Sequence, residues 1–110
     1  MLERLITEAI GKFNAKSAED PALARELEGI RKTVQIEVED GDWYHFALEN
    51  GSVGALLHGS IENPDIRVIA STETLTKLWT NELRVMKAFV SKRLQVKGSI
   101  EDLLRLKKFF

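Results

Sequence analysis

The sequence contains no cysteine among its 110 residues. Disulfide bonds, thiolate metal sites and cysteine nucleophiles are therefore excluded, and the absence fits a reducing compartment. Apolar runs near the roughly twenty residues that a membrane span requires are also missing. The first segment, 1–13, carries Glu3, Arg4 and Glu8 among its apolar residues, which is unlike a signal peptide. We therefore expect a cytoplasmic protein.

The sequence also lacks a strong net charge. Its formal value of −1 favours no class of charged partner. The distribution is more informative: residues 1–71 hold 7 basic and 13 acidic side chains, whereas 72–110 hold 9 basic and 4 acidic ones. The C-terminal third is therefore positive. Such a bias fits an acidic partner or an anionic membrane surface, although cations spread over several elements are often only solvated.

Length and composition predict one domain, residues 1–110. A chain of this size removes roughly two thirds of its unfolded surface from water, which is enough for one core. With 44% hydrophobic and 30% charged residues and no low-complexity segment, nothing in the composition indicates disorder.

Two helices are predicted before the first strand. Asp20 followed by Pro21 is a cap and first-turn pair, so the second of them, a short helix, is expected to run to about Glu28. The first helix is predicted because apolar residues recur at three- and four-residue spacing, which gives one apolar stripe. These residues are Leu2, Leu5, Ile6, Ala9, Ile10 and Phe13.

After residue 32 the apolar period changes to two. The stretch TVQIEVE places Val34, Ile36 and Val38 on one face, as in a half-buried antiparallel strand. A second strand, WYHFALE, ends at Asn50-Gly51, the preferred pair for a two-residue hairpin turn.

That turn predicts a register for the second hairpin. In the first hairpin, the apolar residues of the two strands share one face only if the loop has an odd number of residues. The three-residue segment 40–42 meets this condition. The two hairpins therefore agree on one inner face for a meander of three strands. The predicted facing pairs of the second hairpin are Leu48 with Val53, Phe46 with Ala55, and Tyr44 with Leu57.

The second half of the chain alternates between strands and helices. IRVIA is predicted as a fourth strand and LQVKG as a fifth, and between them Ser71 or Thr72 caps a helix that Asn81 separates from the next. A last helix is expected to begin at Ser99, with Asp102 in a capping-box-like position, and to end with the sequence. The predicted inward stripes of the two central helices are Leu75, Leu78 and Trp79, and Leu83, Met86, Phe89 and Val90.

The resulting order is two helices, three strands, a fourth strand, two helices, a fifth strand and a helix. We therefore predict an α+β fold, with a five-stranded, largely antiparallel sheet and helices packed on one of its faces.

No catalytic or metal-binding constellation is found in the sequence. His45 and His58 fall on the outer face in the predicted register without a second ligand at suitable spacing, which favours solvated imidazoles over a metal site. The glycines of GSVGALLHG fit neither a dinucleotide loop nor a phosphate-binding loop. No basic stripe interleaved with exposed aromatic residues indicates nucleic-acid binding. We therefore expect a noncatalytic protein with no cofactor, no metal and no nucleic-acid partner.

The C-terminal third is rich in apolar residues that must share one sheet face with the first helix. Either they fill a generous core or they enclose something, and periodicity alone favours plain core, since aromatic and Met stripes usually fill cores. The residues are Leu75, Leu78, Trp79, Leu83, Met86, Phe89, Val90, Leu103, Leu104, Leu106, Phe109 and Phe110.

Three stretches carry a resemblance to a known family: WYHFALENGSV, NPDIRVIAS and LTKLWTNELRVMKAFVSKRLQVKGSIEDLLRL. In order and spacing they resemble the sterol-carrier-protein family of nonspecific lipid-transfer domains. The likeness covers nearly the full length, closely from about Glu28 to the end of the sequence and by pattern for the first helices. Where that family commonly has glycine, this chain has Asn81 between the central helices and SKR before the fifth strand. Asparagine tolerates left-handed conformations. The SKR stretch is expected to extend the fourth helix and to alter the end of the cavity.

The resemblance implies noncatalytic binding and transfer of a lipid, such as a fatty acid, fatty acyl thioester, isoprenoid or sterol-like molecule. The lipid would lie in an apolar cavity between the inner sheet face and the C-terminal helices. Lys107 and Lys108 would contact its headgroup or, transiently, an anionic membrane surface. The residues expected to contact the lipid are Phe46, Leu48, Ala55, Leu75, Leu78, Trp79, Leu83, Met86, Phe89, Val90, Leu103, Leu106, Phe109 and Phe110.

Two alternatives stay open at this stage. Phe109 and Phe110 either form a plug or lip for the cavity or merely seal the core. The domain itself either carries lipid or is an interaction or dimerisation module with a filled core, which recruits or assists a lipid-metabolising enzyme. We expect a monomer or weak dimer, and the sequence does not identify the lipid.

Overall fold

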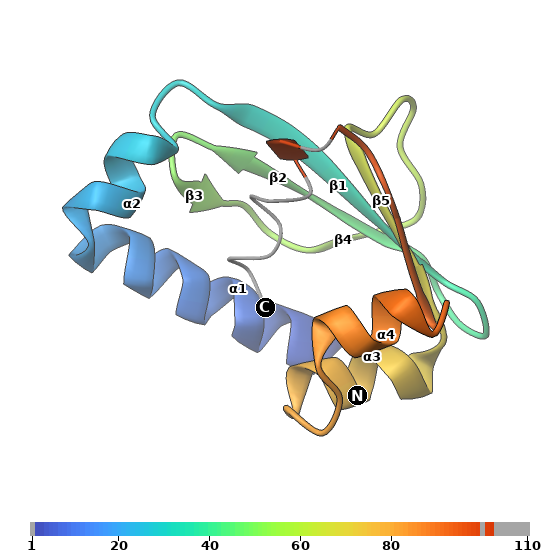
Figure 1. The fold of residues 1–110 in the computed structure, drawn as a ribbon. Coiled ribbons are helices and arrows are strands. Elements are labelled where there is room, and N and C mark those ends of the chain that lie inside the picture. The colour runs from blue at the N-terminus through green and yellow to red at the C-terminus, as the bar shows by residue number, and fades with distance from the viewer. Residues whose placement is uncertain (1, 100, 103–110) are drawn as a thin grey trace.

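The computed structural model of the chain describes residues 2–99 and 101–102. These residues form a twisted sheet with helices over one face: α1 lies along the sheet, and α3 and α4 lie beside it under the edge formed by β5 and β6 (Figure 1). The elements are α1 (Leu2–Glu19), α2 (Pro21–Glu26), β1 (Arg31–Val38), β2 (Tyr44–Glu49), β3 (Ser52–Val53), β4 (Leu57–His58), β5 (Ile66–Ala70), α3 (Thr72–Trp79), α4 (Val85–Val90) and β6 (Leu94–Lys97).

The strands lie in the order β3-β2-β1-β5-β6, and β4 also pairs with β2. Strand β1 pairs with β5 in parallel, whereas the other pairs of this sheet are antiparallel. The predicted α+β fold with a largely antiparallel sheet and helices on one face is thus confirmed. The parallel pair arises because the connection from β4 returns the chain to the same end of the sheet at which β1 begins.

One face of the sheet, called the inner face below, is apolar and buried. Val34 lies between Phe46 and Ile66, and Ile36 between Tyr44 and Val68, so apolar side chains meet directly across three strands. The predicted sharing of one face by the first two strands is therefore confirmed. Buried inner-face residues are Val34, Ile36, Val38, Tyr44, Phe46, Ile66, Val68, Ala70 and Leu94.

The second hairpin begins as predicted and then departs from the predicted register. Asn50 and Gly51 have φ angles of 50° and 81°, as a two-residue primed turn requires, and Leu48 lies opposite Val53. Beyond Gly54, however, the chain that pairs with β2 contains one residue more than β2 does. The structure therefore contains a β-bulge.

The bulge makes the predicted pairings of Ala55 and Leu57 wrong. Tyr44 pairs with His58, and His45 pairs with Leu57. Because side chains alternate between the faces of a strand, a one-residue slip exchanges them. Ala55 and Leu57 are exposed, whereas Leu56 packs against the core.

The caps and breaks of the helices follow the sequence closely. The Asp20 carboxylate accepts hydrogen bonds from the backbone N–H groups of Ala22 and Leu23, and the Ser71 hydroxyl accepts one from Thr74. Asn81, with a φ of 62°, lies in the break between α3 and α4. These predictions are confirmed.

Two predictions for α4 are wrong. The helix turns Ala88 and part of Val85 toward the protein, so the three residues predicted to point inward, Met86, Phe89 and Val90, are exposed. The SKR stretch also does not extend the helix, which ends at Val90. Lys92 instead adopts a φ of 63° in the turn that leads to β6, the conformation in which glycine is common.

The chain leaves β6 through a tight turn. A Cβ atom on Gly98 would lie 3.0 Å from the carbonyl oxygen of Asp65, so this position accepts a side chain poorly. The Ser99 hydroxyl then accepts a hydrogen bond from the backbone N–H of Asp102 at 3.1 Å, which confirms the predicted capping start. Residues 103–110, where the rest of the predicted last helix falls, lie outside the described residues.

Asn14 fastens α1 to the short edge strand β3. Its side-chain amide donates to the Val53 carbonyl at 2.9 Å, and its side-chain oxygen accepts from the Val53 N–H at 2.7 Å. One side chain thus satisfies both backbone groups of an edge residue, which blunts the edge and sets the position of the helix over the sheet.

We expect Asn14→Ala to lower the free energy of unfolding by about 1–3 kcal/mol, because two half-buried backbone groups lose their partners. The exposed substitution Lys12→Ala on the same helix is the control and should change it by less than about 0.5 kcal/mol. Urea unfolding measures both. Equal effects of the two variants would show that the Asn14 contact does not stabilise the edge.

Candidate functional site

The structure brings six of the predicted site residues together over the inner face. Phe46, Leu75, Leu78 and Leu83 are buried in one core cluster with the sheet, and Leu48 and Trp79 pack against this cluster while staying partly exposed. They come from β2, α3 and the α3–α4 connection, so the candidate site combines segments far apart in the sequence.

The structure does not bring the other predicted residues into that cluster. Ala55 lies exposed on the bulge, and Met86, Phe89 and Val90 lie on the exposed side of α4. The remaining candidates lie outside the described residues, and their roles stay predictions. They are Leu103, Leu106, Lys107, Lys108, Phe109 and Phe110.

An ion pair fixes where the C-terminal segment starts. The Lys32 ammonium lies 3.4 Å from the carboxylate of Asp102, whose side chain is only 5% exposed. Lys32 is in phase with Val34, so it lies on the inner face at the start of β1, directly opposite Leu48. The chain has therefore crossed from the edge strand β6 to the central strand β1 by residue 102, on the face that carries the candidate site.

Sequence reasoning missed Lys32. Its signal was present, because a cation in phase with the buried residues of a strand requires a carboxylate partner. The partner, 70 positions further along the chain, was recognised only as a helix cap.

The opposite face of the sheet carries a buried polar network. Glu37, whose side chain is 7% exposed, forms a two-point ion pair with Arg67, in which Nη2 lies 2.9 Å from Oε1. Gln35 donates to Glu37 and accepts from the backbone N–H of Ile61, so the network also fastens the β4–β5 connection. The bonds from Arg67 hold the pKa of Glu37 below its ordinary value, although burial opposes the shift. We interpret this satisfied network as structural.

The two histidines differ from each other in position. His45 lies on the outer face as predicted, with Nδ1 3.0 Å from the Gly59 carbonyl oxygen. The bulge moves His58 to the side of Tyr44, with ring centroids 5.1 Å apart, and its Nε2 lies 3.1 Å from the Glu3 carboxylate. The outer-face prediction for His58 is therefore wrong. Among the described residues, no three His, Asp or Glu side chains gather as a metal site would require.

No described helix has the length and apolar character needed to span a membrane. The sequence model of the SCP-2 sterol transfer family matches residues 10–110. The chain belongs to this family. Family membership favours lipid binding or transfer as the function, and its members are typically noncatalytic carriers.

Solved structures share the fold. The UbiJ-SCP2 ubiquinone synthesis protein is 22% identical over 96% of this chain and 88% of its own, with a TM-score of 0.63. Sterol carrier protein 2 like 2 from Aedes aegypti is 17% identical over the full length of both chains in its crystal structure, with a TM-score of 0.64. Its palmitated form, solved by solution NMR, is 18% identical over 91% of this chain and 88% of its own, with a TM-score of 0.63.

The fold also occurs as a small part of an enzyme. The stereoselective inverting sec-alkylsulfatase Pisa1 from Pseudomonas sp. is 19% identical over 79% of this chain, with a TM-score of 0.63. This chain spans only 14% of the length of that sulfatase. No curated protein sequence matched. At these identities the likenesses establish the fold and leave the ligand to be argued from the site.

The Glu37–Arg67 pair predicts a specific acid sensitivity. Because the pKa of Glu37 is lowered in the folded state, its charged form stabilises the fold above the ordinary value of 4.5, and this stabilisation is lost as the pH falls through the lowered value. We expect Glu37→Gln to lose less stability than wild type on acidification below that point. At neutral pH the variant should be less stable by about 1–2 kcal/mol, a modest loss because Arg67 is partly exposed.

Urea unfolding measured across this pH range tests the prediction. Asp40→Asn is the control, because the pKa of Asp40 is also lowered, by hydrogen bonds from Thr72, but from an ordinary value of 3.8. Its effect should therefore begin at lower pH. A Glu37→Gln variant with the acid profile of wild type would show that this ion pair does not govern acid stability.

Proposed function

We propose that this protein binds the acyl chain of a long-chain lipid against the inner face of its sheet and transfers it without catalysis. The observation that carries the proposal is the set of apolar residues that pack on the core yet stay partly exposed. Leu48 and Trp79 are among them, and Leu48 lies opposite Lys32, next to the point where the C-terminal segment begins. An apolar ligand placed there would extend the core without displacing it.

The energetics favour an acyl chain. Burying about fourteen methylenes at roughly 0.8 kcal/mol each gives about 11 kcal/mol before ordering costs, which leaves micromolar or better affinity. A polar group inside the site is not needed for this affinity. Family membership and the palmitated relative from Aedes aegypti support the same ligand class.

The C-terminal segment completes the proposed site. Because Lys32 and Ser99 fix Asp102 over the inner face, the following residues start at the correct place to cover an acyl chain. We assign Leu103, Leu106, Phe109 and Phe110 to contact with the chain, the two phenylalanines acting as its lip. Lys107 and Lys108 would then lie beside the headgroup, where ammonium groups pair with a carboxylate or phosphate.

A second candidate function is an interaction module that serves a lipid-metabolising enzyme. The exposed apolar side chains of α4 favour it, since exposed apolar patches mark interaction surfaces. The similarity to the UbiJ-SCP2 ubiquinone synthesis protein is consistent with a role beside an enzyme. In this alternative the inner face would be filled by the protein's own side chains.

Native mass spectrometry of freshly purified protein tests the two functions. We expect heterogeneous adducts that organic extraction identifies as fatty acids, acyl thioesters or isoprenoids, because an apolar site retains lipids from the cell during purification. A clean mass that stays clean after incubation with palmitate, palmitoyl thioester and a sterol would refute lipid binding and leave the interaction module.

Matched variants locate the site in the same experiment. Leu48→Gln places a polar amide beside the proposed chain and should lower adduct occupancy about tenfold, whereas the exposed Ala55→Gln on the neighbouring bulge should leave it unchanged. Deletion of Phe109 and Phe110 should also lower occupancy. If that deletion lowers only the stability, the phenylalanines seal the core and do not contact the lipid.

A further inference from the structure

Helix α4 exposes a group of large apolar side chains. Val90 is 74% exposed, Met86 60% and Phe89 48%. The helix leaves them outside because it uses its opposite side for packing: Ala88 is fully buried, and Val85 packs against the core. Three such side chains on one short helix exceed the scattered apolar exposure that is ordinary on a protein surface.

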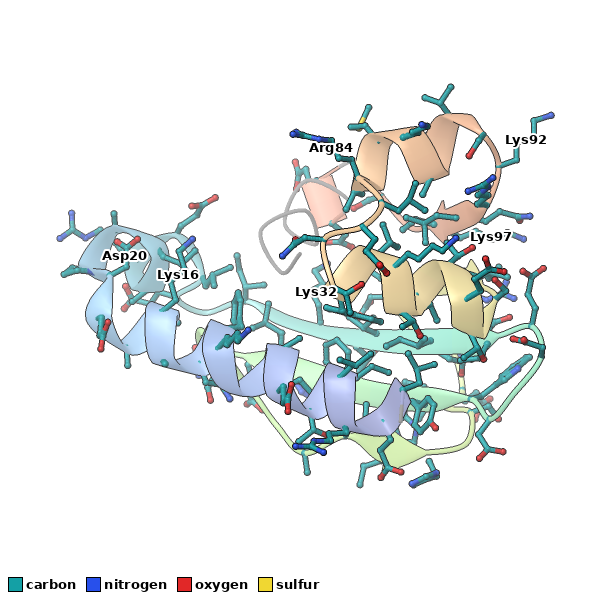
Figure 2. The ribbon with its side chains drawn as sticks, turned by 90° about the horizontal axis from the view of Figure 1, so that it is seen from below. Lys16, Asp20, Lys32, Arg84, Lys92 and Lys97 are labelled. Atoms are coloured by element: carbon teal, nitrogen blue, oxygen red, sulfur yellow. The ribbon has the colours of Figure 1, made fainter. Side chains whose placement is uncertain are left out.

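Cations accompany this group in the sequence, and the segment that carries it contains no acid. The segment 83–98 contains five basic residues and no Asp or Glu. Figure 2 shows Arg84 before α4 and Lys92 after it, at opposite ends of the helix on the outer side of the molecule. All five are exposed, and none forms an ion pair with another residue in the described ranges 2–99 and 101–102. They are Arg84, Lys87, Lys92, Arg93 and Lys97.

We call the three apolar side chains and the adjoining Arg84, Lys87 and Lys92 the α4 face. The exposed side of α1 provides a contrast within the same protein. It mixes Glu3, Arg4, Glu8, Lys12, Lys16 and Glu19, and Arg4 pairs with Glu8. A mixed surface of this kind is typical of a solvated helix, whereas the α4 face combines one sign of charge with apolar bulk.

We propose that the α4 face docks the protein on an anionic lipid bilayer. The cations match lipid phosphates in the headgroup layer, and Met86, Phe89 and Val90 would enter the boundary between headgroups and acyl chains. An acidic protein partner would match the cations too. A bilayer is favoured because Met86, Phe89 and Val90, the exposed large apolar side chains of this face, offer no hydrogen-bonding group to a protein partner, while the adjoining cations match anionic headgroups.

This inference rests on the proposed function, since a carrier of acyl chains must collect and deliver them at a membrane. Beyond the proposed function, the inference names the part of the protein that contacts the membrane and the charge of the lipids that the protein prefers. The described start of the C-terminal segment lies over the inner face, on the side of the sheet that α3 and α4 also cover (Figure 1). Docking through α4 therefore brings that side of the sheet toward the bilayer.

Vesicle flotation tests the proposal. The wild-type protein should float with phosphatidylcholine vesicles that contain about 30% phosphatidylglycerol and stay behind with pure phosphatidylcholine, and high salt should weaken its binding. Met86→Ser combined with Phe89→Ser should lower the partition coefficient about tenfold. Leu57→Ser is the matched control, because Leu57 is 52% exposed and lies on β4, away from α4.

A charge variant with its own control completes the experiment. Lys87→Glu combined with Lys92→Glu should lower the partition coefficient more than tenfold. Loss of one cation near the membrane lowers it about fivefold, and reversal of the charge lowers it further. Lys16→Glu, a single reversal on the far helix α1, should change it less than about twofold. Figure 2 shows Lys16 at the opposite end of the molecule from Lys92.

Lipid occupancy of the same variants, read by native mass spectrometry, separates the two proposals. Variants that lose flotation but keep their lipid adducts support docking through the α4 face. Flotation of wild type on neutral vesicles, or equal flotation of the variants and their controls, overturns it. Wild-type protein that carries lipid but fails to float on anionic vesicles also overturns it and leaves an acidic protein as the partner of this face.

Discussion

Strand β1 pairs with β2 on one side and with β5 on the other, and both registers place apolar residues opposite apolar residues. This double pairing creates one continuous apolar face across the centre of the sheet. A helix-covered apolar face is the main source of stability for a domain of this size. The positions of α1, α3 and the start of the C-terminal segment all follow from the need to cover it.

The polar contacts of the structure fix the edges and the back of this sheet. Asn14 closes the β3 edge, and the Glu37–Arg67 pair fastens the β4–β5 connection on the outer face. Lys32 is the exception on the inner face, and its pairing with Asp102 uses that charge to place the last described residues. Strand β1 thus contributes apolar packing in its middle and, through Lys32, an ion pair with the C-terminal segment at its beginning.

Local patterns predicted much of the fold. The alternation of Val34, Ile36 and Val38, the Asn50-Gly51 turn and the caps at Asp20 and Ser71 each depend on neighbouring residues, and each was confirmed. The resemblance to lipid-transfer domains, carried by the order of such patterns, was confirmed by the family match.

Predictions that depend on distant contacts or small shifts were less successful. The bulge after Gly54 adds one residue, and that shift moves Ala55, Leu57 and His58 to unexpected faces. In the six-residue helix α4, two apolar stripes compete, and packing on β6 selects the small Ala88 over Phe89. The inner-face positions of Phe46 and Leu48 were predicted from alternation, whereas the ion pair of Lys32 depends on a partner 70 positions away and was missed.

The two sides of the proposed carrier have complementary chemistry. The inner face offers apolar surface, and the α4 face combines cations with exposed apolar side chains. The similar fold within a sulfatase indicates that evolution has used this architecture beside catalytic chemistry as well. In the account proposed here, lipid binds at the inner face, and transfer at a membrane is the step that joins the two faces.

The most direct test of the central claim is an NMR titration of the methyl-labelled protein with stearate that carries a nitroxide near its methyl end. An acyl chain on the inner face predicts selective broadening of the methyl signals of Leu48, Leu83, Leu103 and Leu106. Signals of Leu57, in β4, and of Leu23, in α2, should stay sharp. Broadening confined to α4, or equal across the protein, would contradict binding at the inner face.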